Sequence, residues 1–407
     1  MLAKRSRGGR LGSLGRRIIV AGLVVDGVSC RAPEPSHRVV RRQIGDTLLV
    51  QSPADGADGP VLLREVRRLL PSAIDIGRID AAAFGPDGSL WLLDGAGPNG
   101  ASIQIVDSVG SPRAKAGREG AGPGEYRLPL RMFRLADGSM LVKEMSTTRA
   151  VRFDADGRAL ATMELPPAVA TGWVVTPDTV GGWFITASFE ANTPTRIGRF
   201  GWLHFSANGT VIDTMHPPPH LLREATPDGI APGRVRTVAR DGSALTTVPG
   251  PNRLYRYARD ARVVAMEWPG RPPAYGPDER REIQEVEDRM SQLLGKAPAP
   301  LPERKEPSHR ILTDSAQWIW AQLSSDGIRI PDDELPKDEM GLTLRWRDRE
   351  RWAAFDREHA LRFIVDLPPN VTIVDRAGYR LLGVETDRDG MQSLVEWRIV
   401  PDRPDKR

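Results

Sequence analysis

Short apolar segments separated by turn residues run through most of this chain. The segments are four to seven residues long and rich in Val, Ile, Leu, Phe and Trp, and Asp-Gly, Asn-Gly or Pro stands between them. Asp-Gly and Asn-Gly are favoured in the tight turns of β-hairpins because those turns need a positive φ. The pattern therefore predicts an all-β protein made of many short antiparallel strands.

Three sequence markers recur along the chain with a similar spacing. Asp-Gly turns at Asp87, Asp137 and Asp241 are separated by 50 and 104 residues. A unit of about 50 residues that holds about four short strands is typical of a β-propeller blade. The other two series of markers are IVDSVG (105–110), RFDADGRAL (152–160), HFSANGTVI (204–212) and AFDREHALRFI (354–364), and TMELPP (162–167), TMHPPP (214–219), AMEWPG (265–270) and IVDLPP (364–369).

The repeat predicts a six-bladed β-propeller over residues 41–403. The sixth blade combines the segments 371–385 and 393–400 with a strand from near the N-terminus, which hides the sheet edges by closing the ring. DTLLVQS (46–52) is the preferred candidate for that strand, and VLLREVRRL (61–69) is the alternative. A seven-bladed propeller is the alternative if residues 41–77 form more structure. The other five blades are expected at 78–120, 126–167, 171–219, 233–270 and 307–369.

One segment has the period of a helix instead of a strand. Its apolar residues lie at Ile283, Val286, Met290, Leu293 and Leu294, three or four positions apart. We predict a helix over 277–295 inside an insertion, 271–306, that lies on the surface of the propeller. A helix that binds a partner is the alternative.

The N-terminus has the pattern of an export signal. Six basic residues precede a short apolar run, and Cys30, the single cysteine, follows the small residues 27–29. This order resembles a bacterial lipoprotein signal, although Gly27 stands where leucine is usual. We therefore predict an export signal at 1–29, lipidation of Cys30 and a flexible linker at 30–40. An ordinary secretory signal with an unmodified cysteine is the alternative.

The excess of basic residues is confined to this signal. The chain has 57 Lys and Arg against 53 Asp and Glu, but six of the basic residues and one acidic residue lie in the first 29 positions. The remainder is close to neutral, so the charge predicts no nucleic-acid partner. A single cysteine also excludes a disulfide within the chain.

The first blade carries the clearest likeness to a known family. DGSLWLLD, IQIVDSVG and the glycine-rich turn GREGAGPGEY (117–126), with Pro129 after it, resemble the NHL-type repeat of six-bladed propellers. The second unit keeps Arg149–Asp154 of that pattern but lacks the glycine-rich turn. The resemblance implies the fold and export, and it implies no particular chemistry.

The sequence motifs in this chain give only weak indications of a phosphate-binding, metal-binding or catalytic site. GREGAGPGEY lacks the Gly-Lys-Ser/Thr sequence and the following helix of a phosphate loop, so we interpret it as a bend between blades. In HPPPH, the prolines keep His216 and His220 too far apart to share a metal ion. The acidic stretch 324–340 lacks the spacing of a calcium loop and predicts a solvated loop. No catalytic, cofactor-binding or metal-ligating residue is predicted.

These patterns predict an exported, monomeric binding or scaffold protein at the periplasm or the cell-envelope membrane surface. Its membrane contact would be a lipid on Cys30, and an unknown protein or small-molecule ligand would bind at the channel mouth. Trp318 or Trp320, which alternate along one strand, is a candidate for lining the channel or a groove. The alternative is a metal-dependent hydrolase or lyase, similar to a lactonase, at the channel. Three or more Asp, Glu, Asn or His side chains that converge at the channel end would favour the enzyme, and an apolar or arginine-rich mouth would not.

Overall fold

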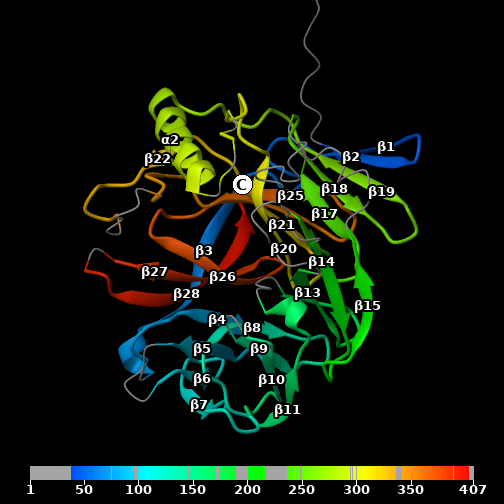
Figure 1. Ribbon diagram of the computed structural model, residues 1–407. Coiled ribbons are helices and arrows are strands. Elements are labelled where there is room, and N and C mark those ends of the chain that lie inside the picture. Colours follow the sequence, from blue (N-terminus) through cyan, green and yellow to red (C-terminus); the bar gives the residue numbers. More distant parts are fainter. Residues whose placement is uncertain are drawn as a thin grey trace, which may run out of the picture. The chain divides into compact units, whose positions relative to one another are not determined.

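Six antiparallel sheets, each with four core strands, follow one another along the chain (Figure 1). The computed structural model describes residues 38–402, except for 75, 96–99, 145–146, 171–174, 189–199, 217–235, 248–249, 294, 296, 299, 336–341 and 388. The predicted export signal and Cys30 therefore lie outside the described residues.

Each sheet is one blade, and its strands are named in order from the channel outward. Blade 1 contains β4 (Ala81–Phe84), β5 (Leu90–Asp94), β6 (Ser102–Val106) and β7 (Pro112–Lys115). Blade 2 contains β8 (Pro129–Arg134), β9 (Met140–Glu144), β10 (Arg149–Phe153) and β11 (Ala159–Glu164). Blade 3 contains β12 (Val175–Pro177), β13 (Trp183–Ser188), β14 (Phe200–Phe205) and β15 (Val211–Met215).

The second half of the ring has the same order. Blade 4 contains β16 (Arg236–Val238), β17 (Ala244–Thr247), β18 (Arg253–Tyr257) and β19 (Val263–Glu267). Blade 5 contains β20 (Ser308–Thr313), β21 (Ile319–Leu323), β24 (Arg351–Phe355) and β25 (Leu361–Asp366). Blade 6 contains β26 (Val371–Ala377), β27 (Arg380–Thr386), β28 (Gln392–Pro401) and β3 (Val61–Leu69). Short 3₁₀ helices lie at η1 (Pro71–Ala73) and η2 (Pro167–Val169).

Buried apolar side chains close the six blades into a ring. One cluster lies between each pair of neighbouring blades, including blades 6 and 1. Trp91 and Phe153 meet between blades 1 and 2, and Trp320 and Trp397 belong to the cluster between blades 5 and 6. A blade buries its two faces only against its neighbours, so the ring must close. The prediction of six blades is confirmed.

The recurring sequence markers correspond to equivalent turns. In blade 1, Asp107 Oδ1 accepts hydrogen bonds from the N–H groups of Val109, at 3.0 Å, and Ser111, at 2.8 Å. Asp154 and Asp356 make the same pair of bonds in the turns of blades 2 and 5. The second series of markers is therefore the hairpin between the third and fourth strands, held by an aspartate that caps its own turn.

The N-terminal segment passes over three blades before it enters the ring. β1 (Val40–Ile44) and β2 (Thr47–Gln51) form a hairpin, and β2 pairs in parallel with β19, the outer strand of blade 4. β3 then pairs with β28 and completes blade 6, so the first and last segments share a blade (Figure 1). The preferred candidate for the closing strand, 46–52, was wrong, and the alternative, 61–69, is confirmed. β3 is longer, with nine residues against five in β2, and it pairs along most of β28.

The glycine-rich turn 117–126 lies between blades 1 and 2, as predicted. Gly117 has a φ of +64°, and a Cβ on it would lie 2.7 Å from Tyr126 Cε1 and 2.8 Å from the Gly124 carbonyl oxygen. Only glycine fits that position. The Tyr126 hydroxyl donates to the Ala116 carbonyl at 2.9 Å, and burial raises the pKa of Tyr126 to about 12.

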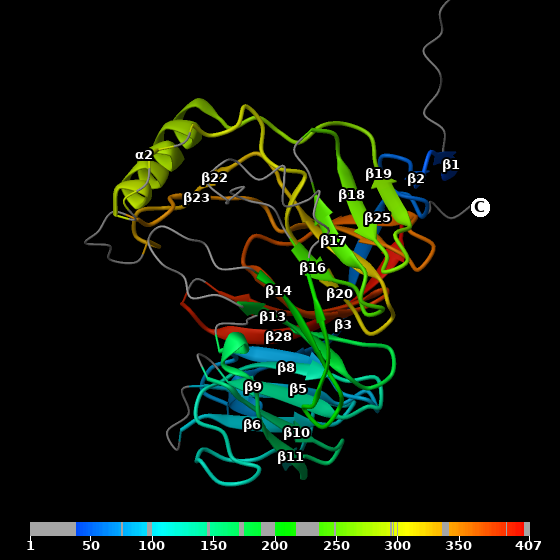
Figure 2. The same cartoon turned by 45° about the vertical axis from the view of Figure 1, so that its right-hand side comes forward.

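The predicted helical insertion is present as α2 (Pro277–Leu293), and Figure 2 shows it beside the short hairpin of β22 (Ile328–Arg329) and β23 (Trp346–Arg347). Lys305 anchors it, because its ammonium group lies 2.5 Å from Glu279 Oε1 of the helix and 2.7 Å from Asp348 Oδ1 of blade 5. Burial alone would lower the pKa of Lys305, but these hydrogen bonds outweigh it and raise the pKa. No helix in the described part of the chain is both long and apolar enough to span a membrane.

Candidate functional site

Two of the positions that the sequence singles out for chemistry lie outside the described residues, namely Cys30 and His220. The other histidine of HPPPH, His216, is exposed directly after β15. In the acidic stretch the described carboxylates, from Asp326 to Glu334, are exposed, as a solvated loop requires. Within the described ranges, no three His, Cys, Asp or Glu side chains come close enough together to hold a metal ion.

The tryptophans singled out on β21 and just before it pack between blades. Trp320 is fully buried, and its Nε1–H donates to Asp314 Oδ2 at 2.9 Å. Trp318 packs against Phe363 and Tyr379, with ring centroids 5.9 and 5.0 Å away. Neither side chain is a channel-lining residue, because the bulky rings fill the join between blades 5 and 6.

Two arginines occupy equivalent positions on the inner strands of opposite blades. Arg131 is the third residue of β8 and lies opposite Lys143, and Arg310 is the third residue of β20 and lies opposite Gln322. In each strand the preceding residue is bulged out of the pairing, and such a bulge redirects the neighbouring side chains. Blades 2 and 5 are three blades apart in a ring of six, so the two arginines approach the channel from opposite sides.

These two arginines are close enough for the charge of Arg131 to affect the pKa of Arg310. Burial lowers the pKa of Arg310, and the positive charge of Arg131 lowers it further, while Glu350 opposes both. A third arginine, Arg376 on β26 of blade 6, belongs to the same group. Burial lowers its pKa to about 10, and the charges of Arg310 and Arg131 add to this effect while Asp375 and Asp314 oppose it. Three blades therefore place positive charge in one region of the channel.

The three guanidinium groups have no protein acceptor among the described residues. No hydrogen bond or ion pair is made by the guanidinium of Arg131 or Arg376 in that part of the chain, and the buried Nε of Arg376 has no partner. Arg310 lies over the ring of Trp352, at 5.9 Å, without donating a hydrogen bond there. Arg131 is exposed, and the other two are half-buried. Solvent or a ligand can therefore reach all three side chains.

Two of the nearby carboxylates, Asp375 and Asp314, already accept hydrogen bonds from backbone donors. Asp375 accepts hydrogen bonds from Phe84 N–H of blade 1, at 2.7 Å, and from Arg376 N–H, at 2.8 Å. Asp314 accepts from Gly378 N–H of blade 6 at 2.7 Å, besides Trp320. These carboxylates hold neighbouring blades together, so they balance the arginines only through space.

Other bonds tie the inner strands together at the same end. Arg134 Nη1 donates to the Gly85 carbonyl of blade 1 at 3.2 Å, and Arg240 Nη2 donates to the Asp178 carbonyl of blade 3 at 2.7 Å. Burial lowers the pKa of Arg240. Bonds between blades 1 and 2 and between blades 3 and 4 thus hold the end of the channel beside the Asp-Gly turns.

A histidine and a carboxylate lie next to this arginine pair. His309, the bulged residue before Arg310, has Nδ1 3.6 Å from Asp348 Oδ2, and Asp348 is also bound to Lys305. Burial lowers the pKa of His309, and the charges of Asp348 and Glu350 oppose that shift. Sequence reasoning missed Arg131, Arg310 and Arg376. A signal existed, because Arg131 and Arg310 each stand four residues before the first residue of the next hairpin turn, Leu135 and Asp314.

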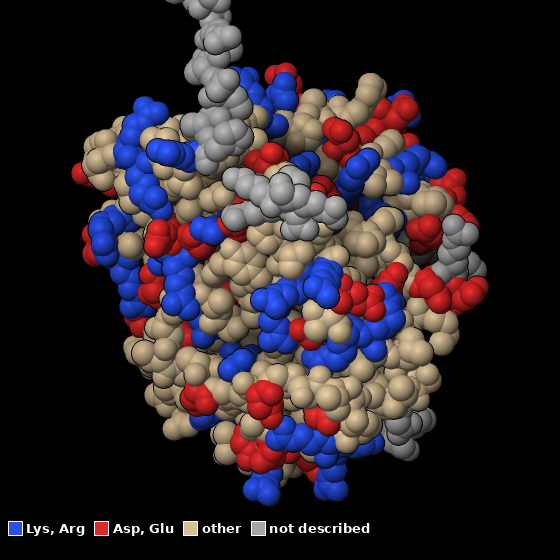
Figure 3. Space-filling view, turned by 180° about the vertical axis from the view of Figure 1, so that it is seen from behind, with Lys and Arg blue, Asp and Glu red and all other residues tan. Residues whose placement is uncertain are grey.

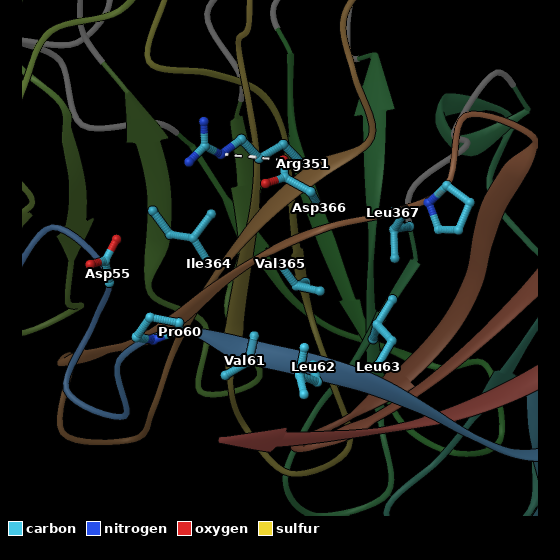
Figure 4. Close-up of a pocket in the computed structure, with 11 residues that line it drawn as sticks. Asp55, Pro60, Val61, Leu62, Leu63, Arg351, Ile364, Val365, Asp366 and Leu367 are labelled. Atoms are coloured by element: carbon cyan, nitrogen blue, oxygen red, sulfur yellow. Dashed lines mark ion pairs between the residues drawn. The ribbon is translucent and has the colours of Figure 1, made fainter. Parts of the chain in front are cut away.

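A separate groove of about 510 Å³ lies at the rim, between the outer strands of blades 5 and 6 (Figure 4). Val61, Leu62 and Leu63 of β3 lie on one side, and Ile364–Leu367 lie on the other, with Asp55 and Pro60 at one end. Arg351 and Asp366 form an ion pair of 3.5 Å across β24 and β25. Elsewhere the surface mixes charges, and Figure 3 shows basic and acidic side chains side by side over one face.

Comparisons with known proteins concern the fold. No family model matches the chain, and no curated protein matches it either. A member of the DUF4221 family from Bacteroides vulgatus is 11% identical with a TM-score of 0.49, over 84% of this chain and 99% of that chain. A protein from Bacteroides fragilis named as exported is 10% identical with a TM-score of 0.47, over 86% of this chain and 99% of that chain.

A virginiamycin B lyase from Staphylococcus aureus is 11% identical with a TM-score of 0.38, over 89% of this chain and 99% of that chain. At these values the likenesses carry no argument about activity, ligand or location. The architecture rests on the strand pairings and on the six interblade clusters. This chain is a six-bladed β-propeller with four-stranded antiparallel blades.

Proposed function

We propose that this chain is an exported binding module that holds an anionic ligand in the propeller channel. The observation that carries the proposal is the set of guanidinium groups of Arg131, Arg310 and Arg376, which come from three blades and have no protein acceptor among the described residues. Confined positive charges repel one another and lose hydration, so an arrangement of this kind is costly unless an anion joins it.

The chemistry of arginine indicates the class of ligand. A guanidinium presents its donors in a planar fork that matches the two oxygens of a carboxylate or two oxygens of a phosphate. Arg131 and Arg310 project from opposite sides, so one oxyanion between them could accept bonds from both. The ligand class is therefore an organic carboxylate or phosphate, and the apolar face of Trp352 beneath Arg310 fixes the orientation of one fork.

Calorimetric titration with inorganic phosphate and with succinate tests the proposal. We expect binding that weakens about 10- to 100-fold in Arg131→Gln and in Arg310→Gln, because a hydrogen bond to a charged group contributes about 1.5–3 kcal/mol. Arg158→Gln is the matched control, since Arg158 is exposed in the turn between β10 and β11, away from the inner strands.

Two results would contradict the channel site. Anion binding that is equal in wild type, Arg131→Gln and Arg310→Gln would place the anion elsewhere. The absence of measurable binding by phosphate, succinate or other mono- and dianions would remove the proposal altogether. All three arginines come from one chain, so a monomer is sufficient for the site.

Export and anchoring are supported by the sequence of residues 1–29 and by the position of Cys30. Cys30→Ser tests the lipid anchor, because a lipoprotein requires the thiol. We expect the variant to be released from membranes and to keep its signal uncleaved or cleaved elsewhere. A variant that stays bound to membranes and is processed as before would show that the lipid anchor is wrong.

The alternative of a metal-dependent hydrolase or lyase has its own measurement. Elemental analysis of the purified protein that finds one equivalent of zinc or calcium would favour that alternative. It would also direct attention to His309 and Asp348, whose side chains meet beside Arg310.

A further inference from the structure

The N-terminal segment covers only the beginning of the outer edge of blade 5. Ala57 N–H donates to the Leu361 carbonyl and Asp58 N–H to the Arg362 carbonyl, both at 2.8 Å. Gly59, with a φ of +74°, and Pro60 then turn the chain toward β3 of blade 6. Ala57 and Asp58 lie in a turn, so the segment covers the first two carbonyls of β25 without adding a strand and leaves the rest of that edge uncovered.

The uncovered part of β25 offers backbone donors and acceptors. Leu367 N–H donates to the Glu350 carbonyl at 2.8 Å, which places that amide on the side of β24. Amides alternate in direction along an antiparallel strand, so the N–H and C=O groups of Ile364 and Asp366 point away from β24. Within the described residues, no backbone bond reaches these outward groups. An edge of this kind is a template for another strand.

Apolar side chains lie directly beside this edge. Both Ile364 and Asp366 line the 510 Å³ groove of Figure 4, together with Val365 and Leu367, and Leu62 on the far side is 53% exposed. Eight of the eleven lining residues are apolar, and Asp55, Arg351 and Asp366 are the polar ones. The groove is thus a place for side chains of a strand that pairs with β25.

The molecule already binds a strand in this way at blade 4. β2 pairs in parallel with β19, the outer strand of that blade, from Val263 opposite Thr47 to Glu267 opposite Gln51. Leu49 and Val50 of β2 are buried, at 8% and 0% exposure. An extended segment with adjacent apolar residues can therefore cover the outer edge of a blade in this fold, and blade 5 is the next position along the same path.

We propose that an extended segment of a partner protein adds to blade 5 as a parallel strand beside Ile364–Asp366 and places apolar side chains in the rim groove. The outward N–H and C=O groups of Ile364 and Asp366 fit the backbone of an extended segment, as β19 fits β2, so the occupant is a strand and not a helix or a small molecule. This mode of recognition combines backbone hydrogen bonds for affinity with pockets for specificity. The proposal is independent of the channel ligand.

Panning a display library of random nine-residue peptides against the propeller, and then synthesising the enriched peptides, tests this. We expect peptides with apolar residues spaced for a strand. Asp366→Pro should weaken their binding about tenfold or more, because proline removes the outward N–H without breaking the pairing with β24. Glu164→Pro is the matched control: Leu165 N–H donates to the Thr148 carbonyl at 2.7 Å, so the amide of Glu164 also points outward, but on blade 2.

Leu62→Asp is a second test that leaves the backbone unchanged, since Leu62 is exposed, and it should also weaken the selected peptides about tenfold. Peptides that bind Asp366→Pro and Leu62→Asp as they bind wild type would overturn the proposal, and so would a library from which nothing is enriched. Self-association that Asp366→Pro abolishes, in the absence of peptide binding, would overturn it in favour of a second copy of the chain.

Discussion

The joins between blades 1 and 2 and between blades 5 and 6 differ in how the space beside the outer strands is filled. At the first join, the glycine-rich turn fills the space beside the outer strand of blade 1. Arg149 of β10 donates to the carbonyls of Ala121, at 2.7 Å, and of Gly122 and Glu125 in that turn. At the second join no such turn is present among the described residues, and a groove stays open between β25 and β3.

The first join thus has a structural role, and the rim of the second join is available for binding. The first join carries the most conspicuous sequence motif, and the Tyr126 hydroxyl and the Arg149 guanidinium there donate to backbone carbonyls. The second join carries only the marker IVDLPP (364–369), which other blades share, and its edge retains unpaired backbone groups. Substitutions at the closed join should therefore lower stability, and substitutions at the rim groove of the open join should change binding with little effect on stability.

The largest effect is expected at Gly117. Gly117→Ala forces a side chain into a left-handed position, at about 1–2 kcal/mol, and against Tyr126 and the Gly124 carbonyl, which adds about 1–3 kcal/mol. We expect a loss of about 2–5 kcal/mol in the free energy of unfolding, measured with urea. Gly59→Ala is the control, because Gly59 has a φ of +74° but no atom within 4 Å of the added Cβ. Equal losses in the two variants would show that crowding at the closed join is unimportant.

The second largest effect on stability is expected at Arg149. Its side chain is 15% exposed and lies 3.4 Å from Glu144 Oε1, and the Glu144 side chain is 1% exposed. Arg149→Met leaves a buried carboxylate and several carbonyls without their donor, so we expect a loss of about 2–4 kcal/mol in urea unfolding. Adding Glu144→Gln should recover part of it, because the uncompensated charge is removed. A double variant that is less stable than Arg149→Met would contradict this account.

The fold was largely predictable because its signals are local. Asp-Gly hairpins and capped turns need particular residues at fixed positions, so the blades that contain them repeat them at a recognisable spacing. The closing strand was less predictable, since DTLLVQS and VLLREVRRL are both apolar strands and differ mainly in length. Only the pairing partners, β19 for the first and β28 for the second, distinguish them.

The candidate sites were not predictable for a different reason. Arg131 and Arg310 are 179 residues apart, and their relation depends on blades 2 and 5 being opposite in the ring. Blade 5 also lacks the Asp-Gly turn, which would have shown from the sequence that β8 and β20 are equivalent strands. The rim groove depends on where the N-terminal segment leaves β25, which is set at Gly59 and Pro60 and has no pattern of its own.

The join between blades 4 and 5 should respond to pH, unlike the closed join, where Arg113 of blade 1 pairs with Asp156 of blade 2. Arg256 of blade 4 donates to His359 Nε2 of blade 5, which requires a neutral ring. Burial, aided by the charge of Arg256, lowers the pKa of His359 to about 4, while Asp356 and Asp241 oppose the shift. An unfolded histidine has a pKa of about 6.5, so the unfolded state binds more protons between these values.

Stability should therefore fall as the pH falls, by about 1–2 kcal/mol between about pH 7 and pH 5. His359→Asn removes this titration and suits the backbone, because His359 has a φ of 67° and asparagine tolerates that region. Urea unfolding at several pH values should give a shallower slope for the variant. A slope as steep as that of wild type would assign the pH dependence to other groups, such as His309.

The smallest effect on stability is expected at the open join itself. Arg351 and Asp366 form their ion pair at 3.5 Å with side chains that are 45% and 63% exposed, and such pairs contribute about 0–1 kcal/mol. Arg351→Met should therefore change the free energy of unfolding by less than about 1 kcal/mol, against the larger loss in Arg149→Met. A loss above about 2 kcal/mol would mean that the rim of the groove contributes substantially to stability. The contrast between a closed and an open join would then be wrong.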